Sequence, residues 1–71
     1  MKTIKQLEKE PIHGNHFHDS KLLNDCHKII LSDSPITDKM RALQLISKIM
    51  GGEEKVSNAD VRKYITFASS L

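Results

Sequence analysis

Apolar residues recur at helical spacing along residues 37–50, TDKMRALQLISKIM, a stretch that Gly51 and Gly52 close. The apolar stripe consists of residues at helical offsets: Ala42, Leu45, Ile46 and Ile49. Three more apolar residues lie beside this stripe and widen it: Met40, Leu43 and Met50. The predicted helix is therefore apolar over about half its circumference, more than a helix at the edge of a domain needs. We expect two covers for it, one from the same chain and one from a second copy.

Two further helices are predicted on either side of this stretch. Residues 20–31 carry apolar side chains on one face, with Asp19 or Ser20 as the N-cap: Leu22, Leu23, Cys26, Ile29 and Ile30. Residues 58–71 do the same after Ser57, which with Asp60 three residues on resembles a capping box: Val61, Tyr64, Ile65, Ala68 and Leu71. The short SDSPI connection predicts that the first two helices run antiparallel.

The central helix has its own predicted ends. Thr37 is the expected N-cap, and Gly51 is expected to adopt the left-handed conformation after the last turn.

The N-terminal residues form a weaker pattern. Thr3 and Gln6 have capping-box spacing and Ile4 and Leu7 share a face, but Pro11 soon stops any helix. We expect residues 1–19 to be a frayed arm, or a turn ordered on contact with a partner, followed by a histidine-containing loop. Residues 20–71 are expected to form a single helical domain. Because no stretch alternates with period two, the predicted fold is all-α, with three short helices per chain paired into a homodimeric bundle.

The size and cysteine content support pairing between copies. A chain of 71 residues has a core that contributes only about 3–5 kcal/mol of net stability. Cys26 is the single cysteine, so no disulfide can form within the chain, and we expect a buried thiol in a reduced compartment. The chain has no apolar run long enough for a membrane span and no signal-peptide pattern at its start, so a cytoplasmic location is expected.

Chemistry-bearing side chains occur without a recognisable catalytic arrangement. His13, His16, His18 and Asp19 lie close together, with His27 further on, but their spacing matches no established zinc module. We expect a solvated loop without metal; a Zn²⁺ or Ni²⁺ site is one alternative, and pH sensing is another. There is no P-loop and no dinucleotide fingerprint, and three short helices leave little room for a catalytic pocket. The sequence predicts no enzyme activity and no cofactor.

Positive charge marks one candidate nucleic-acid contact, formed by Lys55, Arg62 and Lys63. The preceding GGEEKVS loop is longer than the ~3–4-residue turn of a helix-turn-helix, and Glu53 and Glu54 repel phosphate. The net charge of +2 is small, so a solvated helix face is the favoured interpretation.

Protein–protein binding is the class that the wide apolar helix favours. We predict a dimer interface over the central and last helices, comprising Leu43, Ile46, Ile49, Met50, Val61, Ile65 and Ala68. Four residues of the preceding helix are expected to pack over it: Leu22, Cys26, Ile29 and Ile30.

The order of segments from Leu22 to Ile65 resembles the enterobacterial YmgB/AriR group of small regulatory proteins. The resemblance is carried by LLNDCHKIIL, the turn SDSPIT, the helix KMRALQLISKI, the acidic loop GGEEK and the helix containing ADVRKYI. It implies an all-helical homodimer without enzymatic activity. It further implies modulation of a two-component phosphorelay, DNA binding and control of biofilm, acid-resistance or stress genes.

These observations predict a small regulatory protein that binds itself and a signalling protein, as a connector of two-component signalling. One alternative is a dimeric DNA-binding regulator that uses the basic last helix. Another is a phage- or plasmid-encoded inhibitor of a host protein.

Overall fold

A computed structural model describes residues 2–14, 16–52 and 55–70, and those residues form four α-helices. The helices are α1 (Ile4–Glu8), α2 (His16–Leu31), α3 (Ile36–Ile49) and α4 (Asn58–Ser69). No strand occurs within the described ranges, which confirms the predicted all-α class. None of these helices has the length and apolar content needed to cross a lipid bilayer.

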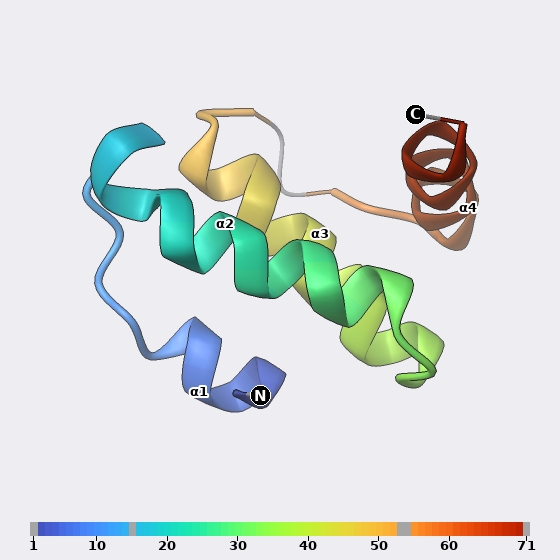
Figure 1. The fold of residues 1–71 in the computed structure, drawn as a ribbon, viewed down its shortest axis with the longest axis horizontal. Coiled ribbons are helices and arrows are strands. Elements are labelled where there is room, and N and C mark those ends of the chain that lie inside the picture. Colours follow the sequence, from blue (N-terminus) through green and yellow to red (C-terminus); the bar gives the residue numbers. More distant parts are fainter. Residues whose placement is uncertain (1, 15, 53–54, 71) are drawn as a thin grey trace.

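Helices α2 and α3 form an antiparallel pair that makes the most extensive packing in the fold (Figure 1). Their facing sides supply most of the core: Leu22, Cys26, Ile29, Ile30, Ala42, Leu45 and Ile49. The connecting turn is held by the Ser32 hydroxyl, which donates to the Ile29 carbonyl at 2.7 Å and lies 2.7 Å from the Ser34 hydroxyl. The short polar connection thus produces the antiparallel pairing that its length predicts.

Helix α1 corrects the expectation of a frayed N-terminal arm. Thr3 and Gln6 form the capping box that their spacing predicts, because the Thr3 hydroxyl accepts from the Gln6 N–H and the Gln6 side chain accepts from the Thr3 N–H. Ile4 and Leu7 are buried, with Leu7 fully inaccessible. A five-residue helix is marginal alone. Here the burial of both apolar side chains against α2 and α3 stabilises it.

Helix α2 begins earlier than predicted, at His16 instead of residue 20. Asp19 is therefore not the N-cap but a residue of the first turn, and its side chain is almost fully buried. Its carboxylate accepts a hydrogen bond from the His13 N–H at 3.0 Å. That contact holds the incoming chain against the helix, and residues 16–19 of the predicted loop belong to α2.

Only one of the two ends of α3 lies where the sequence predicts it. Its N-cap is Pro35, without a side-chain cap, so the prediction of Thr37 is wrong by two residues. The Pro35 carbonyl instead accepts from the N–H groups of Asp38 and Lys39, at 3.0 and 3.1 Å. At the other end Gly51 has φ +76°, which confirms the predicted left-handed residue.

Helix α4 lies to one side of the α2–α3 pair and is seen nearly end-on in Figure 1. Its predicted capping box is present: the Ser57 hydroxyl accepts from the Asp60 N–H, and the Asp60 carboxylate accepts from the Ser57 N–H at 2.9 Å. The Ser57 hydroxyl also donates to Asp60 Oδ2 at 3.1 Å, and the two hydrogen bonds that the carboxylate accepts, from the backbone N–H and from the hydroxyl of Ser57, lower the pKa of Asp60.

Helix α3 is covered by elements of its own chain. It contacts α1, α2 and α4, so the second cover expected from another copy is supplied in part within the chain. The cover from α4 is thin, because Val61 is the residue of that helix that is buried. Other apolar side chains of α3 and α4 pack against the core and are only partly buried, among them Leu43, Ile46 and Ile65.

Candidate functional site

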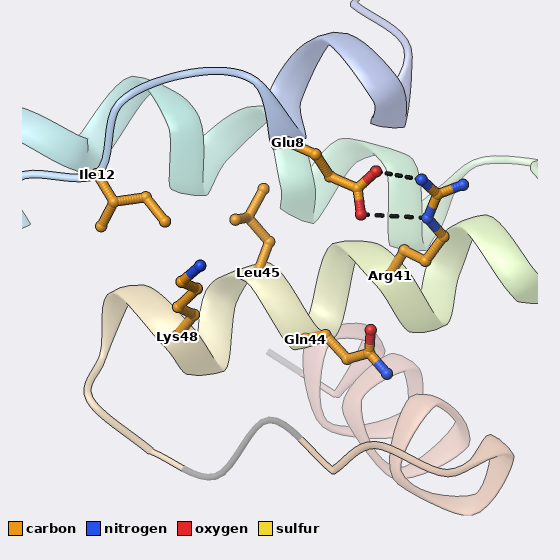
Figure 2. A pocket seen from close by; sticks show the side chains of 6 residues that line it. All are labelled: Glu8, Ile12, Arg41, Gln44, Leu45 and Lys48. Atoms are coloured by element: carbon orange, nitrogen blue, oxygen red, sulfur yellow. Dashed lines mark hydrogen bonds and ion pairs between the residues drawn. The ribbon is translucent and has the colours of Figure 1, made fainter.

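A cleft of about 200 Å³ opens between the N-terminal segment and α3 (Figure 2). Two lining residues come from the N-terminal segment, and the other four come from one side of α3: Glu8 and Ile12, then Arg41, Gln44, Leu45 and Lys48. The α3 residues are spaced by three, one and three positions, which places them on neighbouring turns of one helix face. The packing of α1 against α3 therefore creates the cleft.

One end of the cleft is closed by an ion pair. The Arg41 guanidinium donates twice to the Glu8 carboxylate, from Nε to Oε2 at 3.1 Å and from Nη2 to Oε1. Both side chains remain partly exposed, at 40% for Arg41 and 34% for Glu8. An exposed pair contributes little stability, but this two-point geometry fixes the orientation of both groups.

The rest of the cleft carries donors without partners. Neither the Lys48 ammonium nor the Gln44 amide has a hydrogen bond or ion pair to another residue of the described ranges. Lys48 and Leu45 extend from α3 toward the segment that carries Ile12 (Figure 2). Because Glu8 is already paired with Arg41, the lining has one surplus positive charge, beside two aliphatic side chains.

The predicted interface residues do not all face outward. Ile49 and Val61 are buried within the single chain, at 7% and 0% exposed. Met50 is 55% exposed, and the others are half-buried on α3 and α4: Leu43, Ile46, Ile65 and Ala68. Leu22, Cys26, Ile29 and Ile30 are buried on α2. The structure therefore divides the predicted set into core residues and a partly open remainder.

The candidate nucleic-acid residues share an exposed region at the start of α4. Lys55 lies in the segment before the helix, while Arg62 and Lys63 lie in its first two turns, and all three are exposed. None of them forms an ion pair with another described residue. Asp60 lies close enough that Lys63 contributes to its lowered pKa, so an acidic group interrupts this basic region.

The histidines fall into two environments. His13 and His18 have ring centroids 5.7 Å apart, and the side chain of His16 lies outside the described part of the structure. Across the described residues, no three His, Cys, Asp or Glu side chains are placed to hold a metal ion.

His27 instead joins α2 to α4, through 2.6 Å between its Nδ1 and the Tyr64 hydroxyl. Burial, and to a lesser degree the neighbouring Cys26, raises the pKa of Tyr64.

The α1–α3 cleft was missed from the sequence because its two walls come from segments that were interpreted separately. Arg41, Gln44 and Lys48 carry a detectable signal, since they share a polar side of the predicted central helix. Glu8 and Ile12 carry none, because they lie in residues expected to be unfolded.

Comparison with protein-family models, curated proteins and solved structures finds no match for this chain. The resemblance to the YmgB/AriR group therefore remains a prediction.

Proposed function

We propose that this protein is a non-enzymatic regulator that acts through protein–protein contacts, as a homodimer paired through α3 and α4. The observation that carries the proposal is the apolar line along α3 that the chain leaves partly open. Leu43, Ile46 and Met50 are spaced by three and four positions; the first two are only partly buried where they pack against the core, and Met50 is 55% exposed. A second copy that packs here buries this apolar surface, which adds buried area to the small core of the single chain.

The resemblance to YmgB/AriR supplies the biological setting of the proposal. A dimer of this kind acts as a connector that modulates two-component signalling and thereby biofilm, stress or acid-resistance genes in the cytoplasm. Ile49 and Val61 stabilise each protomer in this arrangement, since each is already buried. The contact between copies then consists of Leu43, Ile46, Met50, Ile65 and Ala68.

The test is molar mass in solution, measured by sedimentation from micromolar to millimolar concentration. We expect a dimer, and we expect Met50→Asp and Ile46→Asp to give a monomer, because each places a charge in an apolar contact. Ile36→Asp is the matched control, since Ile36 lies on α3 and is already 43% exposed. Helical circular dichroism separates dissociation from unfolding, and Met50→Asp is the variant that leaves the protomer core intact.

A wild-type monomer over the whole concentration range would remove the homodimer. A dimer unchanged by Met50→Asp and by a folded Ile46→Asp would exclude this face as the contact.

A DNA-binding regulator is the second candidate, and the exposure of Arg62 and Lys63 without ion pairs favours it. If these side chains contact phosphate, Arg62→Ala with Lys63→Ala lowers affinity for duplex DNA and reduces the salt dependence by about two ion equivalents. Lys21→Ala with Lys28→Ala on α2 is the charge-matched control. Binding that falls equally in both double variants indicates nonspecific attraction and rejects α4 as the DNA contact.

A further inference from the structure

We propose that the α1–α3 cleft binds an aliphatic carboxylate, with Lys48 pairing the acid and Ile12 and Leu45 contacting the apolar chain. This site lies on the side of α3 that faces α1, apart from the Leu43–Ile46–Met50 line. The inference therefore does not rest on the proposed dimer.

The charge of the lining selects an anion. Arg41 directs two donors to Glu8, which neutralises the one acidic group of the cleft. Lys48 remains as a cation without a partner in the described residues, next to the Gln44 amide. A carboxylate placed between them accepts a charge-assisted hydrogen bond from Lys48 and a neutral one from Gln44.

The apolar lining and the volume limit the rest of the ligand. Leu45 is 7% exposed, so it forms a fixed wall, and Ile12 faces the same cleft from the N-terminal segment. The volume of about 200 Å³ lies below the ~300–1,000 Å³ of pockets for drug-sized ligands. The ligand class is therefore a carboxylate with a chain of only a few carbon atoms.

Both sides of the cleft must be present for this contact. Glu8 and Ile12 belong to the N-terminal segment, which is held to the bundle by Ile4, Leu7 and the Glu8–Arg41 pair. A ligand that contacts Ile12 and Lys48 together adds a link between this segment and α3. Binding should consequently protect the amides of α1 from hydrogen exchange, such as the Leu7 N–H bonded to the Thr3 carbonyl.

The test is a titration of the full chain with sodium pentanoate at constant ionic strength, followed by two-dimensional NMR. We expect saturable shifts of the Gln44 side-chain amide and of the Ile12 and Leu45 methyl groups, with a dissociation constant of about 1–10 mM. Pentanamide, a neutral molecule of similar size, should bind more weakly. Protection of the α1 amides should rise with pentanoate occupancy.

Lys48→Gln is expected to weaken pentanoate binding about fivefold, in line with the modest strength of a partly exposed charge pair. Lys28→Gln removes the same charge from an exposed position on α2 and should leave binding unchanged. Equal affinity for pentanoate and pentanamide, wild-type affinity in Lys48→Gln, or no shift at the cleft residues would each overturn the proposal.

The carboxylate has two sources, a free short-chain acid or the side chain of an acidic peptide. A parallel titration with N-acetylglutamate amide, against N-acetylglutamine amide, separates them. Tighter binding of pentanoate identifies a free acid, and tighter binding of the glutamate compound identifies a peptide side chain.

Discussion

Ile30→Ala is expected to lower the free energy of unfolding by about 2–4 kcal/mol, because it leaves a cavity where α2 packs on α3. Ile30 is fully inaccessible and belongs to the main core cluster. Since a core of this size contributes only about 3–5 kcal/mol, the variant should be largely unfolded at physiological temperature. Urea denaturation followed by circular dichroism measures the change.

Ile36→Ala provides the matched control for this cavity. The same side chain is shortened on the neighbouring helix, but Ile36 is 43% exposed, so the free energy of unfolding should change by about 0.5 kcal/mol or less. Equal effects of the two substitutions would show that Ile30 is not packed in the core as described.

The second large effect concerns the reactivity of Cys26. Burial, followed by the negative charges of Asp25 and Glu10, raises the pKa of this thiol from 9.0 to about 12. The thiolate is the reactive form, so its fraction near neutral pH is about a thousandfold lower in the folded chain than in the unfolded chain. We expect alkylation by iodoacetamide to be slower by at least about this factor until denaturant is added.

The sign of the pH dependence follows from the raised pKa. The contribution of Cys26 to the free energy of unfolding is fully present below pH 9. It is lost as pH rises from 9 toward 12, because the thiol ionises first in the unfolded chain. Cys26→Ala should remove that alkaline loss, measured as urea midpoints at a series of pH values. Rapid alkylation of the native protein at neutral pH would contradict the buried environment.

Local signals in the sequence were good predictors where they needed no distant partner. The capping boxes of Thr3 with Gln6 and Ser57 with Asp60 depend on residues three apart, and both are present. The left-handed Gly51 depends on its own lack of a side chain, and it too is present.

Predictions failed where a distant contact decided the outcome. The pattern of residues 1–11 does not indicate that α2 and α3 bury Leu7, so the sequence alone predicts a frayed segment there. Asp is a residue type that favours the N-cap position. Asp19 lies instead in the first turn of α2, where its carboxylate accepts a hydrogen bond from the His13 N–H. The prediction of Thr37 as the N-cap failed for a local reason instead, because the extended backbone of Pro35 already begins α3.

The candidate site shows the same division. The open apolar line on α3 follows from its periodicity, and so does the polar side that carries Arg41 and Lys48. The opposing wall of the cleft depends on where the N-terminal segment docks, which no local pattern encodes. The sequence therefore predicts the α3 wall of the α1–α3 cleft, but it does not indicate that a second wall lies opposite.

The sparse attachment of α4 also sets an order of events during folding. Among its described residues, Val61 is the one that is fully buried, Tyr64 and Ile65 pack partly buried against the core, and the His27–Tyr64 hydrogen bond joins it to α2 across 37 positions. The α2–α3 hairpin instead closes through a short turn, so its contacts form at a lower entropic penalty. We therefore expect the hairpin to form first and α4, whose start is capped by Ser57 and Asp60, to dock last and detach first.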